Sequence, residues 1–317
     1  MRDAPAPTLL LPRGNKGPRG KKGTAQDEGP AQGADPALDL RPLAATIGAE
    51  VHGIDLRQPV DAAALAAIRV AFLQWKVLVF RGQHGLTPEA HKAFGEHFGS
   101  FAKHPFRPAL DDHPELLPIA KEPDERVNVG GGWHTDMTFM PTPPFGTLLY
   151  AVELPAPGLG DTMWSDNEAA FAGLSPGLQA TLRGLRAWHT AEKVHGPAAV
   201  QQEKRSEFRQ RAAEQQLVHA LVSHPVVRMH PETGRPCLFV NRSFTVRFDG
   251  WSEAESRTLL EHVFVHMAKP EYVLRMHWQP GTLVLWDNRN TQHYALNDYH
   301  GQRREMRRLM IEGDAPY

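Results

Sequence analysis

One histidine and one aspartate stand two positions apart near the middle of the chain, as His134 and Asp136. Side chains two positions apart on a β-strand point to the same face of the sheet. An imidazole and a carboxylate would therefore lie beside one point in space, where they could bind a metal ion. The His-x-Asp combination is common by chance, so it indicates a site only with support from elsewhere in the chain.

That support comes from residues 284–293, where an apolar strand leads into a polar turn that ends at His293. Two histidines and one carboxylate form the ligand set of mononuclear non-haem Fe(II) oxygenases, which leaves three coordination positions open. Two of these positions suit a bidentate 2-oxo acid, and the third suits O2. Arg304 follows eleven residues later. Its planar guanidinium suits the far carboxylate of such an acid better than a lysine would.

Several strings carry a family resemblance that covers nearly everything from about residue 40 to the C-terminus. They are Trp133-His134-Thr135-Asp136, Glu153-Leu154-Pro155, Gly160-Asp161-Thr162, Trp286-Asp287-Asn288-Arg289, Thr291-Gln292-His293-Tyr294-Ala295 and Gln302-Arg303-Arg304. With these strings the chain resembles the taurine dioxygenase family of Fe(II)- and 2-oxoglutarate-dependent dioxygenases.

The resemblance implies roles for five residues. His134, Asp136 and His293 are expected to hold Fe(II) and form the catalytic centre, while Thr162 and Arg304 are expected to bind the C5 carboxylate of 2-oxoglutarate. It also implies an oxidoreductase that consumes O2 and 2-oxoglutarate, releases succinate and CO2, and hydroxylates a C–H bond of its substrate. If the hydroxylated carbon bears a heteroatom group, the product can collapse to a carbonyl compound and release that group.

Two other functions compete with this interpretation. A zinc-dependent hydrolase can use two histidines and a carboxylate to activate water. A non-catalytic binding domain could carry the same residue types without chemistry. The hydrolase has no need of Thr162 and Arg304 at the family's spacing, and the binding domain does not require three ligands that converge from distant positions.

The resemblance also implies a small organic anion as substrate. In the taurine enzymes an arginine four residues after the co-substrate arginine grips the substrate sulfonate, and Arg308 stands at that position. His104 resembles a substrate-contacting histidine of the family, and Phe244 resembles an aromatic residue of its pocket.

Four further positions depart from the taurine pattern. Arg107 stands where that pattern has a tyrosine, and Gly130 stands where it has an asparagine. Lys193 and His195 stand where less basic residues are usual. The loss of polar partners for an amine, together with the gain of cations, argues against taurine itself. We therefore expect a bulkier anion, such as a sulfonate, sulfate ester, phosphate ester or carboxylate.

The elements that must position these residues are mainly strands with flanking helices. An amphipathic helix is expected at residues 253–267, with Val263 and Val265 on its inner face. The strands do not alternate regularly with helices, which favours an antiparallel sandwich or jelly roll over a doubly wound sheet. The cupin-like double-stranded β-helix of the family agrees with this pattern. The main predicted strands are 76–80, 147–153, 161–165, 272–278, 282–286 and 304–311.

One domain, residues 37–317, is expected to contain all of this machinery. Residues 1–36 are basic and rich in proline and glycine, which is typical of a disordered tail. Residues 167 to about 218 are expected to form a largely helical insertion. Residues 104–132 have little regular pattern and are expected to be long loops. These loops and residues 190–215 are the predicted lid elements.

Composition excludes several classes of partner. The net formal charge of the 317 residues is -1, which gives no reason to expect nucleic acid or an anionic membrane as partner. No apolar stretch is long enough to predict a transmembrane helix. The single cysteine, Cys237, excludes an internal disulfide and suits a reducing compartment, so a cytoplasmic location is expected. We also expect a homo-oligomer.

Overall fold

The computed structural model describes residues 38–197 and 215–317, so the predicted tail and most of the second predicted lid lie outside the described residues. One seven-stranded sheet forms the centre, in the order β1-β2-β3-β13-β5-β15-β4. Its neighbouring strands are antiparallel except β2 and β3. The strands are β1 (Asp39–Pro42), β2 (Ala49–His52), β3 (Val77–Phe80), β4 (Leu116–Lys121), β5 (Gly146–Glu153), β13 (Leu283–Asp287) and β15 (Arg304–Ile311).

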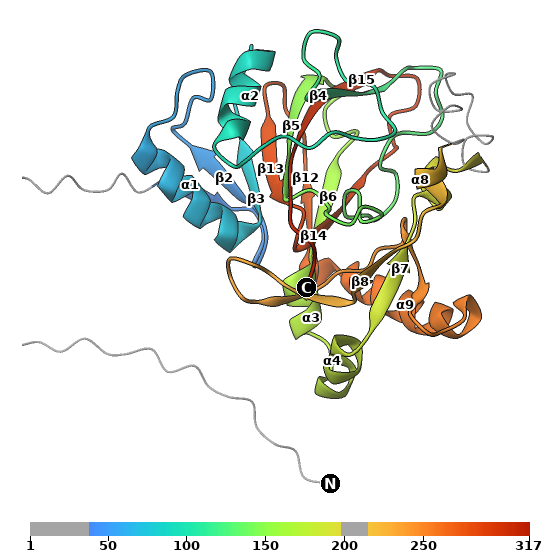
Figure 1. The fold of residues 1–317 in the computed structure, drawn as a ribbon. Coiled ribbons are helices and arrows are strands. Elements are labelled where there is room, and N and C mark those ends of the chain that lie inside the picture. Colours follow the sequence, from blue (N-terminus) through green and yellow to red (C-terminus); the bar gives the residue numbers. More distant parts are fainter. Residues whose placement is uncertain (1–37, 198–214) are drawn as a thin grey trace, which may run out of the picture. The chain divides into compact units, whose positions relative to one another are not determined.

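A smaller antiparallel sheet packs against the large one. It contains β12 (Val273–Met276), β6 (Thr162–Asp166) and β14 (Thr291–Ala295), in that order. Side chains from both sheets form one buried cluster, in which the rings of Trp164 and Trp286 lie 5.7 Å apart between centroids. Two packed sheets with helices outside them confirm the predicted jelly-roll class (Figure 1).

Two helices cover the outer face of the large sheet. They are α1 (Ala62–Trp75) and α2 (Pro88–Glu96), which lie beside β2 and β3 in Figure 1. The Asp61 carboxylate accepts a hydrogen bond from the Ala64 amide and caps α1. All four residues of β3 are buried, because two pack beneath α1 and two face the smaller sheet. This double burial explains why β3 is a continuous apolar run.

The interval predicted as a helical insertion is only partly helical. Its described residues contain α3 (Asn167–Ala172), α4 (Pro176–Arg183), α5 (Glu192–His195) and α8 (Gln216–His219), but also the strand β7 (Arg186–His189). β7 pairs with β8 (Val222–Pro225) and β11 (Thr245–Phe248), which both follow it by more than thirty residues. A local pattern does not reveal pairing over such a separation. A separate hairpin joins β9 (Val227–Met229) and β10 (Pro236–Leu238).

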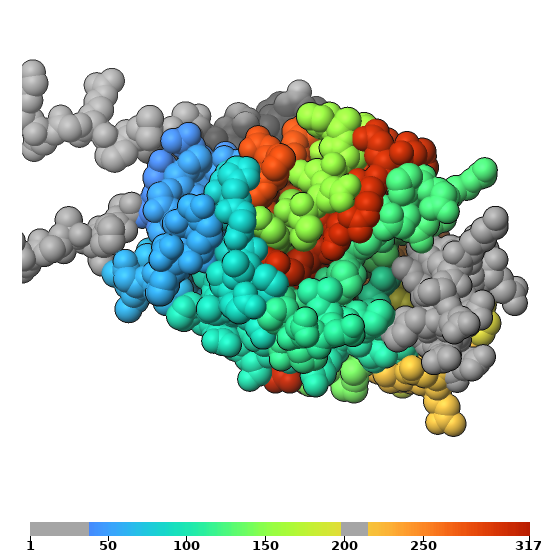
Figure 2. Space-filling view, turned by 90° about the horizontal axis from the view of Figure 1, so that it is seen from above, coloured from blue at the N-terminus to red at the C-terminus, as the bar shows by residue number. Residues whose placement is uncertain are grey.

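The predicted loop region 104–132 also contains a strand. β4 pairs with β15 on one side only and forms the edge of the large sheet. Pro118 lies inside this strand, and proline, which lacks the amide proton, is tolerated there because an edge strand has one unpaired side. Figure 2 shows the teal to green residues of this region alongside the red C-terminal strand.

The long helix α9 (Glu253–Met267) has the predicted bounds, and a capping box between Ser252 and Glu255 starts it. Val263 is buried, but Val265 is 57% exposed, so its predicted inward position is wrong. Two residues rotate a helix by about 200°, which turns Val265 away from the core. A short 3-10 helix, η1 (Pro270–Tyr272), follows. No helix in the described ranges is long and apolar enough to cross a membrane.

Candidate metal centre

The two predicted histidine ligands are joined through their backbones. The His134 amide donates to the His293 carbonyl at 3.0 Å, and the His293 amide donates to the His134 carbonyl at 2.7 Å. The predicted polar turn lies at residues 288–290, and it leads into β14, of which His293 is the third residue and which pairs with β6. The polar residues around it conceal the strand, because most of them are buried and hydrogen-bonded.

The three side chains converge on one point. The ligand atoms of His134, Asp136 and His293 all lie within 4.8 Å of one another, and all three residues are buried. Asp136 Oδ1 lies 3.7 Å from His134 Nε2 and 3.9 Å from His293 Nε2. The two imidazole rings are 4.1 Å apart between centroids. In the described part of the chain this is the only group of at least three such side chains that could hold a metal ion.

Hydrogen bonds fix which atom His134 and Asp136 present. His134 Nδ1 lies 2.7 Å from the Gly132 carbonyl oxygen, and such an oxygen can only accept, so the proton sits on Nδ1 and the lone pair on Nε2. The Thr147 hydroxyl donates to Asp136 Oδ2 at 3.0 Å, which leaves Oδ1 facing the two imidazoles. Partners of this kind orient metal ligands and tune their basicity.

Asn288 holds the backbone of Asp136 on both sides. Its Oδ1 accepts from the Asp136 amide at 2.7 Å, and its Nδ2 donates to the Asp136 carbonyl at 3.0 Å. The residue belongs to one of the strings that carry the family resemblance, but the resemblance predicted no separate role for it. A side chain that pairs with the backbone of a residue 152 positions away leaves no local signal.

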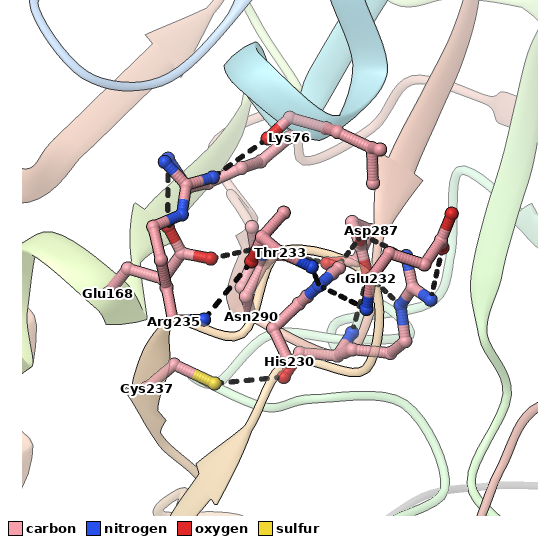
Figure 3. Close-up of polar contacts among 12 residues, drawn as sticks. Lys76, Glu168, His230, Glu232, Thr233, Arg235, Cys237, Asp287 and Asn290 are labelled. Atoms are coloured by element: carbon pink, nitrogen blue, oxygen red, sulfur yellow. Dashed lines mark hydrogen bonds and ion pairs between the residues drawn. The ribbon is translucent and has the colours of Figure 1, made fainter. Parts of the chain in front are cut away.

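A buried ionic network anchors the turn that carries Asn288. Asp287 pairs with His230 at 3.0 Å, and both are labelled in Figure 3. Arg289 lies 2.7 Å from Asp287 and 2.7 Å from Glu232. Asp287 and His230 are completely buried. Removal of one partner from such a network leaves an uncompensated buried charge, so the network keeps the turn between β13 and β14 in place.

Electrostatics prepare the three side chains for a cation. Burial alone would raise the pKa of Asp136, but the charge of Arg308, the neighbouring imidazoles and the hydrogen bond from Thr147 outweigh it and lower that pKa to about 2. Burial lowers the pKa of His293 to about 3 and also lowers the pKa of His134. At neutral pH the site therefore offers one carboxylate and two neutral imidazoles, which are the protonation states that bind metal.

The donor set fits Fe(II). Two imidazole nitrogens and one carboxylate oxygen are the ligands of non-haem Fe(II) oxygenases, which keep three positions open for other molecules. The described residues place Arg308 beside the carboxylate, with its Nη1 at 3.2 Å from Asp136 Oδ1. The open side of the centre is therefore flanked by a cation that could receive an anionic group.

The two predicted co-substrate residues are both buried. The Thr162 hydroxyl accepts from Trp278 Nε1 at 2.9 Å. Arg304 is 5% exposed, and its Nε and Nη2 have no hydrogen-bond partner in the described part of the chain. A buried guanidinium with unused donors fits a carboxylate ligand that is absent from the protein itself. Gly160 lies against it, because a Cβ there would come within 3.2 Å of Arg304 Cδ.

A cavity of about 630 Å³ opens in front of His134 and Asp136. Its walls combine cationic and polar residues with apolar ones, including Val129, Met137 and Phe139. The described structure does not place Thr162 and Arg304 on these walls. All the residues predicted for the substrate site line the cavity, namely His104, Arg107, Gly130, Lys193, His195, Phe244 and Arg308.

Two of these residues have clear partners. His104 Nδ1 accepts from the Phe106 amide at 3.1 Å, and burial together with the charges of Arg308 and Arg107 holds its pKa well below the ordinary value. His104 is therefore a neutral ring with its proton on Nε2. Lys193 donates to the Thr245 carbonyl at 2.7 Å, so its ammonium is anchored at the side of the cavity.

Gly130 has a structural reason to lack a side chain. Its φ is +79°, and a Cβ there would lie 3.2 Å from His134 Cε1. Its carbonyl accepts from the Ala295 amide at 2.9 Å, which ties the loop to β14. The glycine therefore lets the loop pass directly over a metal-facing imidazole.

Known proteins resemble this chain over most of its length. The family model described as taurine catabolism dioxygenase TauD, TfdA family, matches residues 39–310. An alkylsulfatase of Acinetobacter baylyi is 36% identical over 277 residues, which cover 87% of this chain and 86% of that protein. An alpha-ketoglutarate-dependent sulfate ester dioxygenase of Pseudomonas putida is 35% identical, with 88% and 91% covered. The structure of a taurine dioxygenase from Burkholderia xenovorans has a TM-score of 0.74 at 36% identity, with 89% and 93% covered.

Proposed function

Because the chain belongs to the TauD/TfdA family and is a 2-oxoglutarate-dependent dioxygenase, we propose that it acts on sulfate esters of aliphatic alcohols. His134, Asp136 and His293 would hold Fe(II), since their donor atoms, burial and protonation states suit that ion. Thr162 and Arg304 would bind the C5 carboxylate of 2-oxoglutarate. When bound, iron and 2-oxoglutarate would activate O2 for the hydroxylation of a substrate C–H bond.

One observation carries the substrate proposal, and it concerns Arg308. The residue is 7% exposed, lines the cavity and donates to Asp136 through Nη1, while its Nε and Nη2 have no partner among the described residues. Two unused N–H groups of a buried guanidinium form a fork that matches two oxygens of a sulfate group. The neutral His104 ring on the same cavity wall offers a further N–H donor.

The rest of the cavity suits an alkyl chain. Phe139, Phe244 and Met137 belong to one buried apolar cluster, and all three face the cavity. Valine side chains line other parts of the wall, at positions 127, 129, 194 and 246. An anion-binding end beside the metal ligands and an apolar remainder together favour an amphiphilic ester over a small zwitterion. The named activities of the bacterial relatives, an alkylsulfatase and a sulfate ester dioxygenase, support the same class.

The proposed reaction balances as an oxidative ester cleavage. The substrate R–CH2–OSO3⁻, 2-oxoglutarate and O2 give R–CHO, sulfate, one proton, succinate and CO2. One oxygen atom enters succinate, and the other hydroxylates the carbon that bears the sulfate group. The hydroxylated ester then expels sulfate as its C–O bond breaks and the hydroxyl loses its proton. Arg308 would hold the sulfate group, so that the adjacent carbon faces the metal ligands.

The test is a substrate panel on the Fe(II)-loaded full chain. Short- and medium-chain 1-alkyl sulfates are compared with alkyl sulfonates, alkyl phosphates, carboxylates and taurine, and succinate and inorganic sulfate are quantified. We expect alkyl sulfates to stimulate succinate release most, with one sulfate per succinate. Stimulation by neutral or cationic compounds only, or succinate release without sulfate, would contradict the proposal.

Two arginines of β15 provide a matched pair for this test. Arg308→Gln removes the cation in the cavity and should abolish the response to alkyl sulfates while 2-oxoglutarate still binds. Arg307→Gln is the control, because Arg307 donates to the Leu86 carbonyl at 2.6 Å on the opposite face of the strand. An Arg308→Gln variant that responds normally would show that another group binds the anion.

A further inference from the structure

A buried lysine ends the edge strand β4. Lys121 is 2% exposed, and its Nζ has no hydrogen-bond partner in the described part of the chain. Its ammonium lies 4.4 Å from the centroid of the Tyr299 ring. Such a contact stabilises an ammonium by less than its burial destabilises it. The fold alone therefore does not account for a lysine here.

The same residue stands directly opposite Arg304. Lys121 and Arg304 are cross-strand partners on β4 and β15, and both side chains are buried. The Arg304 guanidinium carbon lies 6.0 Å from the same Tyr299 ring. Two like charges opposite each other on neighbouring strands destabilise a sheet. Their burial together indicates an anion that is not part of the described protein.

The nearby carboxylates are engaged elsewhere. Asp161 pairs with Arg275 and His277, each at 2.7 Å. Asp298 accepts from the Gly160 amide at 2.7 Å. Neither carboxylate makes an ion pair with Lys121 or Arg304 in the described residues, so both cations keep unused donors.

A second buried lysine, Lys76, forms ion pairs within the protein. Lys76 is 4% exposed, and its Nζ lies 3.2 Å from Asp166 and 3.6 Å from Glu168. Figure 3 labels Lys76 and Glu168 within the network that contains them. Lys76 is thus neutralised by its own protein, whereas Lys121 is not. The contrast points to a ligand as the partner of Lys121.

We propose that Lys121 is a second cation of the subsite for the distal carboxylate of the co-substrate, where it acts with Arg304 and selects a dicarboxylic 2-oxo acid. The inference rests on the proposed function only in assigning Arg304 to 2-oxoglutarate. Lys121 is then a binding and specificity residue that the family's usual threonine and arginine do not include. The buried charge would lower the stability of the ligand-free protein and contribute affinity when the dicarboxylate binds.

Calorimetric titration of the Mn(II)-loaded full chain tests the proposal with two probes. 2-Oxoglutarate carries the distal carboxylate, and 2-oxopentanoate has the same carbon chain without it. Lys121→Met should weaken 2-oxoglutarate binding about tenfold or more, the loss of one charge-assisted hydrogen bond. Its affinity for 2-oxopentanoate should stay unchanged. The Tm of the ligand-free variant should rise, because an unpaired buried charge has been removed.

Lys76→Met is the matched control. It removes a buried lysine that is already paired, so its Tm should fall while 2-oxoglutarate affinity stays unchanged. Lys121→Arg, which keeps the charge, should retain most of the affinity.

Three results would overturn the inference. They are an unchanged 2-oxoglutarate affinity in Lys121→Met, an equal loss for both oxo acids, or a lowered Tm for the ligand-free variant. If Lys121→Met does not fold, Lys121→Gln takes its place, and failure of both would show a structural lysine. A wild-type chain that binds 2-oxoglutarate but ignores alkyl sulfates would refute the proposed substrate and leave this inference standing.

Discussion

Asp136 owes its position to residues that never face the open side of the site. Asn288 binds its backbone on both sides, and Thr147 binds the carboxylate oxygen that turns away from the imidazoles. The Asn288 amide also donates to the Pro144 carbonyl at 3.0 Å, so one side chain joins two segments of chain. Metal affinity therefore depends on Asn288 although it is not a ligand.

Asn288→Ala should weaken Mn(II) binding about 10–100-fold, because Asp136 loses the hydrogen bonds that orient it. The same change should lower the free energy of unfolding by about 1–3 kcal/mol, since buried backbone groups lose their partners. Metal titration and urea denaturation measure the two effects. Asn297→Ala is the control, because the Asn297 side chain donates to the Arg126 carbonyl in a loop and not to Asp136. Unchanged metal affinity in Asn288→Ala would show that the turn is held without this side chain.

Arg304, the first residue of β15, and Arg303 directly before it allow a sharp test of co-substrate binding. Arg304→Lys should raise the apparent KM for 2-oxoglutarate, because an ammonium cannot replace the planar fork of a guanidinium. Loss of a buried charged pair costs about 2–5 kcal/mol. Arg303→Lys should leave KM unchanged, since Arg303 binds the carboxylates of Glu122, Glu153 and Glu305 outside the site. Equal KM values for the two variants would mean that another cation binds the co-substrate.

At this scale the sequence predicted the side chains that converge on the candidate metal centre and missed those that support them. His134, Asp136 and His293 could be found because metal ligands have a restricted set of residue types and spacings. Asn288 and Lys121 could not, since asparagine and lysine are common on surfaces and their burial depends on strands that meet only in the fold. The structure brings the predicted residues together, and their roles as ligands stay a prediction until metal binding is measured.

At the scale of elements, strands with a strong local pattern were predictable and strands that depend on distant partners were not. β5, β13 and β15 are long or apolar, and the pattern of α9 repeats with helical spacing. β4 contains a proline and β14 is polar, so neither resembles a strand in isolation. Both form because a neighbouring strand offers an unpaired edge, which no window of sequence contains.

The loop before His134 passes close to the His134 ring at Gly130, and a substitution there can test whether this close approach matters. Gly130→Ala should weaken metal binding and lower stability, because the new Cβ would press on the His134 ring at 3.2 Å. Gly53→Ala is a matched control, since Gly53 has the same φ of +79° but a Cβ there would meet no atom within 4 Å. Each variant carries the left-handed backbone cost of about 1–2 kcal/mol, so only their difference reports the contact. Equal metal affinities would show that the loop can shift.

For the whole molecule, the two-sheet architecture places a polar site beside an apolar core. Trp164 and Trp286 fill the space between the sheets, and His293 lies 4.8 Å from the Trp286 ring between centroids. The predicted fold class is confirmed because the order of strand and helix patterns along the chain, which lacks regular β-α alternation, can be read without knowing which strands pair. The predicted homo-oligomer depends on contacts between copies of the chain. Light scattering of the purified chain would test it.

Buried histidines away from the metal centre give the whole molecule a pH dependence. His91 is completely buried, and burial together with the charge of Arg307 lowers its pKa to about 3. Burial lowers the pKa of His224 to about 4, although its hydrogen bonds to the Met140 and Thr138 carbonyls oppose the shift. In the unfolded chain a histidine has its ordinary pKa of about 6.5. Between these values the unfolded state binds protons that the folded state excludes.

This difference in bound protons determines how the stability of the fold changes with pH. The stability of the metal-free protein should be full above pH 6.5 and should fall as the pH drops from about 6.5 towards 4. Each such histidine contributes a slope of up to about 1.4 kcal/mol per pH unit. Carboxylates with lowered pKa values, such as Asp287 and Glu232, add a loss of the same sign mainly below about pH 5, so the window above pH 5 reports chiefly the histidines. Urea denaturation at pH 7, 6 and 5 measures this slope.

His91→Gln tests whether protonation of a buried histidine on unfolding causes the acid sensitivity. Between pH 6.5 and 4.5 the unfolding free energy of the variant should depend less steeply on pH than that of the wild type. The difference should correspond to at most one proton bound on unfolding, because glutamine does not titrate. His91 Nδ1 accepts from Arg307 Nε at 3.2 Å, and the amide oxygen of glutamine can take over that hydrogen bond. His300→Gln is the control, since His300 is exposed. If both variants keep the wild-type slope, acid sensitivity arises from other groups, and the buried state of His91 does not couple to folding.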